Sequence, residues 1–151
     1  MPDTDTIETI LNLPHSQQKV WNALTTPEGL NGWFGDRVTM TLKEGSPIHF
    51  EWNEFGEAGG VIETVKPISC FAYRWRAHGV AEDVKITLEN STLVTFELTP
   101  VSTEKTQLRV VESGFTNLPP EMRELSHREN SHGWQVELGE LVEFLREDAH
   151  E

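Results

Sequence analysis

Apolar and polar residues alternate through most of the middle of the chain. Between residues 37 and 115, large apolar side chains recur at every second position, a period typical of antiparallel strands with one buried face and one wet face. Residues 45–47, 56–60, 66–67 and 102–105 carry turn signals and divide this region into a predicted six-stranded meander, with 56–60 as a hairpin turn. The positions that share the inward phase are Ile48, Phe50, Trp52, Phe71, Tyr73, Trp75, Val94, Phe96, Leu98, Leu108 and Val110.

Different patterns flank the meander. Residues 6–13 are β-branched and partly alternating, which predicts a first strand. Ser16 is a predicted N-cap for a short helix, which Pro27 and Gly29 end while starting a second one. Residues 77–91 fit no period and are interpreted as a loop or a short edge strand. A long helix is predicted over residues 120–146, with an inner stripe of His127, Asn130, Trp134, Leu138, Leu141 and Leu145.

This order of elements predicts an α+β protein with a single domain over residues 1–151. The net charge is −13, from 12 basic and 25 acidic residues. Such acidity argues against nucleic acid and anionic membranes as partners, because both require basic side chains. The apolar run at 93–98 is far shorter than the ~20 residues that span a bilayer. The first residues lack the pattern of a signal peptide, so we expect a cytoplasmic protein.

The sequence carries no pattern that indicates a cofactor or a metal ion. One cysteine excludes an internal disulfide and a cysteine zinc cluster. Six histidines are present, but His127 and His132 are five residues apart and would point away from each other on a helix. No glycine-rich phosphate loop occurs either. We therefore expect neither a metal site nor a bound cofactor.

Several segments resemble the activator of Hsp90 ATPase homologue-like family, within the START and Bet v 1-like superfamily. The matching segments are residues 7–13, 20–30 with Trp33 and Phe34, 73–75, 91–98, 112–115 and 133–134 with the leucines that follow. The resemblance covers nearly the whole chain. It implies a helix-grip fold, in which a curved antiparallel sheet wraps a long C-terminal helix and encloses a mostly apolar cavity.

The inward aromatic residues are the first candidates for a binding site. They could line a cavity for a small hydrophobic or aromatic molecule, or they could simply fill the core. Trp33 and Phe34 follow a helix breaker and precede a strand, so they would lie at the cavity rim or act as a packing plug. The predicted ligand-binding residues are Trp33, Phe34, Phe50, Trp52, Tyr73, Trp75, Phe96, Glu112, His127, Asn130 and Trp134.

Glu112 is the main polar candidate because it shares the inward phase of Leu108 and Val110. A buried carboxylate needs partners, which His127, Asn130 or a nearby arginine could supply. Glu112 could anchor a ligand or act with His127 as a general acid or base, and it could equally be a strand-end residue that caps a turn or reaches solvent. If it is an anchor, Glu112→Gln should change ligand affinity more than stability.

Three functions remain open at this point. The first is binding of a small hydrophobic molecule in the cavity. The second is an enzyme of the cyclase or hydrolase type acting on a hydrophobic substrate, as relatives on this fold imply. The third is regulation of an Hsp90-type chaperone, with a link to stress response. The eukaryotic activator carries a further N-terminal domain, for which 151 residues leave no room. An exposed edge strand could also pair two copies into a homodimer.

Overall fold

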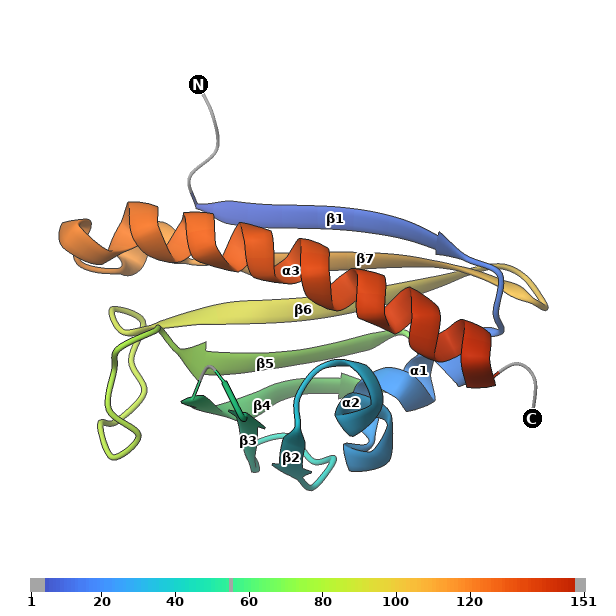
Figure 1. The fold of residues 1–151 in the computed structure, drawn as a ribbon, viewed down its shortest axis with the longest axis horizontal. Coiled ribbons are helices and arrows are strands. Elements are labelled where there is room, and N and C mark those ends of the chain that lie inside the picture. Colours follow the sequence, from blue (N-terminus) through green and yellow to red (C-terminus); the bar gives the residue numbers. More distant parts are fainter. Residues whose placement is uncertain (1–4, 55, 149–151) are drawn as a thin grey trace.

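The computed structural model describes residues 5–54 and 56–148, which form an antiparallel sheet crossed by one long helix (Figure 1). The strands are β1 (Thr6–Leu13), β2 (Arg37–Met40), β3 (Pro47–Trp52), β4 (Gly56–Lys66), β5 (Cys70–Arg76), β6 (Ser91–Ser102) and β7 (Lys105–Ser113). The helices are α1 (Gln17–Thr25), α2 (Pro27–Trp33), the short 3-10 helix η1 (Phe115–Asn117) and α3 (Pro120–Asp148). The predicted α+β helix-grip architecture is confirmed.

The strands lie in the order β1-β7-β6-β5-β4-β3-β2, and every neighbouring pair is antiparallel. Strands β2 to β7 therefore form the predicted meander, and β1 joins it beside β7. α3 runs across one face of the sheet, and α1 and α2 lie beside the C-terminal half of α3 (Figure 1). β1 and β2 are the two edges, so the edge strand that a predicted homodimer requires is present.

Side-chain caps explain where the two short helices begin. The Ser16 hydroxyl accepts a hydrogen bond from the Lys19 backbone N–H at 3.2 Å, as its predicted role requires. Thr26 ends α1 and caps α2, because its hydroxyl accepts from the Gly29 N–H at 2.9 Å. Pro27 occupies the first turn of α2, where a missing N–H costs nothing. These caps fix the chain direction as it enters the segment between α2 and β2.

The alternating positions of the meander form the inner face of the sheet. Phe50, Phe71, Tyr73 and Phe96 are each at most 1% exposed, and they face the stripe of α3. Trp134, Leu138, Leu141 and Leu145 are the buried part of that stripe. Asn130 and His127, one and two turns before Trp134, are half-buried. The predicted inner face and stripe thus coincide with the observed core.

The prediction of a hairpin turn at residues 56–60 is wrong, because these residues begin β4. Gly60 pairs with Ile48 on one side and Trp75 on the other. A Cβ at Gly60 would lie 2.1 Å from the Arg74 carbonyl oxygen, so glycine here permits a close approach of two strands. Gly60 therefore serves strand packing rather than a turn.

Residues 77–90 contain no strand. Of the two interpretations of this segment, a loop or a short edge strand, the loop is therefore the one observed. Val84 and Leu88 are 42% and 56% exposed, so their alternation does not reflect a buried face. Asn90 organises the loop instead, accepting from the Thr87 N–H at 2.8 Å and donating to the Lys85 carbonyl at 2.8 Å. Local side-chain hydrogen bonds thus replace a sheet partner.

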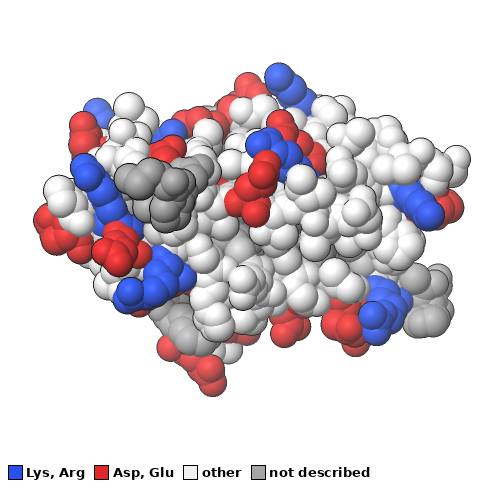
Figure 2. Space-filling model, turned by 90° about the horizontal axis from the view of Figure 1, so that it is seen from above, with Lys and Arg blue, Asp and Glu red and all other residues white. Residues whose placement is uncertain are grey.

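Charged residues of both signs lie among each other on the face shown in Figure 2. Arg109 illustrates this arrangement, since its guanidinium pairs with Glu8 and with Glu97 across neighbouring strands. Within the described part of the chain, no helix is long and apolar enough to cross a membrane.

Candidate functional site

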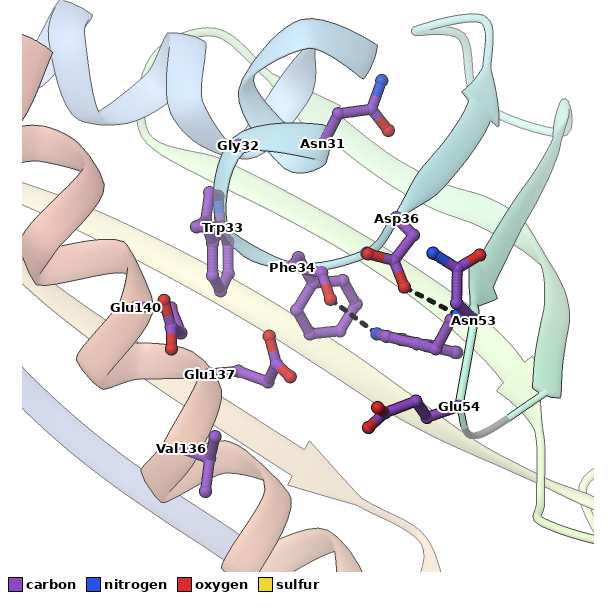
Figure 3. Close-up of a pocket in the computed structure, with 12 residues that line it drawn as sticks. Asn31, Gly32, Trp33, Phe34, Asp36, Asn53, Glu54, Val136, Glu137 and Glu140 are labelled. Atoms are coloured by element: carbon purple, nitrogen blue, oxygen red, sulfur yellow. Dashed lines mark hydrogen bonds between the residues drawn. The ribbon is translucent and has the colours of Figure 1, made fainter.

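An open cleft of about 420 Å³ lies between α2, the end of β3 and the middle of α3 (Figure 3). The segment between α2 and β2 forms one wall, the residues after β3 form another, and α3 forms the third. Asn31 holds the first wall in place, because its side-chain oxygen accepts from the Val38 N–H at 2.7 Å. The residues that line the cleft are Asn31, Gly32, Trp33, Phe34, Gly35, Asp36, Trp52, Asn53, Glu54, Val136, Glu137 and Glu140.

Phe34 closes the inner end of this cleft. It is 4% exposed, and its ring is stacked near those of Trp75 and Trp134, with centroids 5.9 Å and 5.5 Å away. The Trp52 indole N–H donates to the Phe34 carbonyl oxygen at 2.6 Å and fixes the backbone. Trp33 is also buried, at 5% exposure, and donates to the Ala23 carbonyl at 2.8 Å. Phe34 therefore plugs the interior while also lining the cleft, which unites the two predicted alternatives.

Behind Phe34, the inner aromatic residues pack against one another. Phe50 lies 5.3 Å from Tyr73 and 5.5 Å from Trp75 between ring centroids, and Phe96 lies 6.0 Å from Trp134. These edge-to-face and tilted pairs are the arrangements that aromatic rings prefer. The aromatic cluster, which we define as Phe34, Phe50, Trp52, Tyr73, Trp75, Phe96 and Trp134, occupies the space between sheet and α3. Contact of these rings with a ligand stays a prediction.

The Tyr73 hydroxyl is exceptional within this cluster. Tyr73 is 1% exposed, and its hydroxyl oxygen is buried without a hydrogen-bond partner among the described residues. Burial raises the pKa of this phenol well above its usual value, and the charges of Glu112 and Glu137 raise it further. The hydroxyl is thus a neutral polar group with an unused donor and acceptor. A buried polar group without a partner costs free energy, and so calls for an explanation.

Glu112 is fully buried and joins α3 to the sheet. Its Oε1 accepts from the Trp134 indole at 2.8 Å and from the Asn130 amide at 3.1 Å. Its Oε2 accepts from the Trp75 indole at 3.0 Å, the Thr92 hydroxyl at 2.6 Å and the Asn130 amide at 3.0 Å. The predicted inward direction and the predicted Asn130 contact are observed. Every one of these partners is an uncharged donor, which suits a carboxylate that only accepts.

His127 does not take part in this network. Its Nε2 lies 2.9 Å from the Thr6 carbonyl oxygen, and its ring packs edge-to-face on Phe115 with centroids 5.2 Å apart. The hydrogen bonds of Glu112 come from other residues, so the structure does not assemble the acid and base pair suggested by the sequence. His127 instead ties α3 to the beginning of β1.

Four carboxylates surround the cleft, and the sequence reasoning did not identify them. Asp36, Glu54, Glu137 and Glu140 line it, and no Lys, Arg or His is among the described residues of its lining. Burial raises the pKa of Glu137 to about 7, with further contributions from Glu140 and Asp36. Figure 3 shows the Glu137 side chain beside Phe34. The only sequence signal was that Glu137 lies three residues after Trp134 and four before Leu141, and so at the border of the inner stripe.

A second hollow, of about 400 Å³, lies between α1 and the end of α3. Its lining combines apolar residues such as Phe144 and Leu145 with polar ones such as Lys19, whose Nζ donates to the Leu145 carbonyl at 3.0 Å. This hollow does not border the aromatic cluster. The cleft above Phe34 is therefore the stronger candidate for an organic ligand.

One group of described residues has spacing suitable for a metal ion. His49 Nε2 lies 3.5 Å from Glu57 and 3.9 Å from Glu82, and all three ligand atoms lie within 4.8 Å of one another. Arg76 lies 3.8 Å from Glu82 and balances part of the negative charge. We interpret the group as an ion-pair network on the outer face of β3 and β4.

A curved antiparallel sheet that wraps one long helix defines a helix-grip protein. Residues 14–146 match the model of the family described as activator of Hsp90 ATPase homolog 1-like protein. The chain belongs to this family, which confirms the resemblance noted above. No curated protein matches the sequence.

Solved structures share the fold at low identity. DynU16, from the dynemicin biosynthetic locus, superposes with a TM-score of 0.75 at 23% identity, covering 96% of this chain and 48% of that chain, so this chain spans about half of DynU16. The Aha1 dimer from Colwellia psychrerythraea gives 0.72 at 23% identity, covering 93% and 95%. An HSP90 activator from Plasmodium falciparum gives 0.74 at 18% identity, covering 93% and 96%. At these identities the likeness shows the fold alone.

Proposed function

We propose that this protein binds a small apolar or aromatic molecule between the sheet and α3, and that the molecule enters through the cleft above Phe34. The observation that carries the proposal is the cleft itself, whose inner end is an aromatic ring continuous with the aromatic cluster. Its volume of about 420 Å³ falls within the range of small-molecule sites. The concave shape, the half-buried Trp52 ring and the Phe34 ring at the inner end together favour an organic ligand.

The Tyr73 hydroxyl supports the same proposal. Phe50 and Trp75 contact both Phe34 and Tyr73, so these two rings connect the inner end of the cleft to Tyr73. A ligand that displaced the Phe34 ring and passed between Phe50 and Trp75 would bring a polar group within reach of this unused donor. The missing hydrogen bond would then be supplied by the ligand, which explains why a polar group is kept there.

Filling the cleft should weaken binding. Val136 lines the cleft and is 49% exposed, so Val136→Phe is expected to occupy the space without disturbing the core. N-phenylnaphthylamine, an uncharged aromatic probe that fluoresces in apolar surroundings, should bind the wild-type protein saturably. We expect Val136→Phe to weaken its binding at least about tenfold, equivalent to about 1.4 kcal/mol.

Gln135→Phe is the matched control, because Gln135 is an exposed neighbour on α3 outside the cleft lining. It should bind the probe like the wild type. Equal weakening by both variants would place the probe elsewhere on α3. Failure of the wild-type protein to bind the probe or any compound of an aromatic panel would contradict the proposal.

Family membership favours a second candidate, regulation of an Hsp90-type ATPase. The fold is shared with an HSP90 activator from Plasmodium falciparum. Under this proposal, equimolar addition of the protein should raise the rate of ATP turnover by the Hsp90 of its own organism at least about twofold, since differential binding to the active state shifts its population. The measurement is a coupled ATPase assay, with the heat-denatured protein as control. An unchanged rate together with no co-elution would remove this candidate.

A further inference from the structure

We propose that the cleft selects a cationic ligand, an organic amine with an aromatic or alicyclic body, whose ammonium group lies beside Glu137 while its body packs on Phe34 and Trp52. This inference rests on the proposed binding function and specifies the class of ligand. It draws on three separate features of the structure, namely the charge of the lining, the spacing of the carboxylates and the aromatic surface between them.

The charge of the lining is of one sign. Asp36, Glu54, Glu137 and Glu140 reach the cleft from three different segments, and the described residues of its lining include no basic one. Glu137 is half-buried, so its charge is screened less by water than a surface charge. Such a site repels carboxylates and phosphates and attracts cations. Fatty acids and phosphorylated compounds are therefore disfavoured as ligands.

The spacing of the carboxylates disfavours a bare metal ion. Among the described residues, the group whose ligand atoms all lie within 4.8 Å of one another is His49, Glu57 and Glu82, none of which lines the cleft. Carboxylates distributed around a cleft without such convergence suit an ammonium group, which is larger than a metal ion and accepts several separate partners.

Two aromatic residues lie between the carboxylates, namely the half-buried Trp52 and the almost fully buried Phe34. Phe34 and Trp52 have ring centroids 5.7 Å apart in an edge-to-face arrangement, and both line the cleft. Aromatic faces attract cations as well as apolar groups. The site thus offers partners for both halves of an aromatic amine.

Three probes of one shape test the charge preference: naphthylmethylamine, naphthalenemethanol and naphthoate. Their dissociation constants would be measured by titration calorimetry on the wild-type protein at low salt. We expect the amine to bind about tenfold more tightly than the alcohol, as one partly buried ion pair would provide. The carboxylate should bind most weakly.

The variant Glu137→Gln tests whether Glu137 is responsible for the preference for the amine. This variant should weaken binding of the amine about tenfold and leave the alcohol unchanged. Glu129→Gln is the matched control, because Glu129 is exposed on the same helix, about two turns away, and does not line the cleft. It removes the same charge and should retain the preference for the amine.

The pH dependence provides a further readout. The pKa of Glu137 is about 7, and the groups that face it are Asp36 and Glu140. The carboxyl loses its charge as the pH falls through 7, so the affinity for the amine should drop between pH 8 and pH 6 while that for the alcohol stays constant. The probe amine remains protonated throughout this range.

The outcomes separate the two proposals. If the wild-type protein binds amine and alcohol equally, and Glu137→Gln changes neither, the charge preference is overturned while the binding function stands. If both charge variants reduce amine binding equally, general electrostatic attraction and not Glu137 accounts for it, and the assignment fails. If none of the probes binds to the wild-type protein, the binding function fails and this inference with it.

Discussion

Replacing Glu112 by Gln is expected to lower the free energy of unfolding by about 2–4 kcal/mol, because a buried acceptor would be exchanged for a group that is partly a donor. Glu112 accepts five hydrogen bonds from four side chains, Trp75, Thr92, Asn130 and Trp134. Together these bonds connect β5, β6, β7 and α3 at one point.

The Gln amide cannot satisfy the same partners. Indole N–H groups only donate, so the amide NH₂ would face Trp134 on one side or Trp75 on the other. In either orientation at least one buried donor loses its acceptor. The loss is large because the site is fully buried and water cannot replace the missing partner.

Urea denaturation followed by tryptophan fluorescence would measure this effect. Glu104→Gln, at an exposed turn position between β6 and β7, removes the same charge and should change stability by less than about 0.5 kcal/mol. The sequence suggested that Glu112→Gln would alter affinity more than stability, and the observed hydrogen bonds reverse that expectation. Unchanged stability combined with lost binding of an aromatic probe would restore Glu112 as a ligand anchor.

Periodicity alone was sufficient for the sheet and the inner face. The meander was predictable because alternating positions such as Phe71, Tyr73 and Trp75 face a single large core, so burial leaves a regular mark on the sequence. The α3 stripe was predictable for the same reason. Inward phase also identified Glu112, and helical spacing placed Asn130 opposite it, where the structure has the two in contact.

The cleft could not be predicted in this way. Its carboxylates come from the turn after α2, the turn after β3 and the border of the α3 stripe, and none of these positions has a periodic signature. Glu137 lies at the border of the stripe, three residues after Trp134 and four before Leu141, where the spacing does not show whether the side chain is covered. In the structure it is half-buried, and α2 packs beside α3. His127 was predicted as a partner of Glu112 from its stripe position, but it lies further along α3, beside the beginning of β1.

The prediction of a turn at residues 56–60 failed for another reason. A glycine that is needed for the close approach of two strands, such as Gly60, looks the same in the sequence as a glycine in a turn.

Replacing Phe34 by Ala should lower the free energy of unfolding by about 3–5 kcal/mol, the range for removal of a buried aromatic ring. Phe34 lies in contact range of five other rings, those of Trp33, Phe50, Trp52, Trp75 and Trp134. It therefore links α2, β3, β5 and α3. The rings around it belong to rigid elements and cannot collapse fully into the vacated space, so most of the cavity should remain.

The same substitution should open the cleft toward Tyr73, and this separates a plug from an ordinary core residue. If Phe34 is the plug, benzene or phenol added to Phe34→Ala should raise its thermal midpoint with saturation, because a ligand that binds only the folded state stabilises it. Phe34→Leu, which keeps much of the volume, should lose less stability and respond less to either compound. Val101→Ala, at a position 63% exposed, should show neither effect.

Phenol should raise the thermal midpoint of Phe34→Ala more than benzene does. This difference should disappear in the double variant with Tyr73→Phe, because the second change removes the buried hydroxyl that phenol would reach. Equal responses to the two compounds would mean that the space behind Phe34 does not extend to Tyr73, and the ligand would then be confined to the outer cleft.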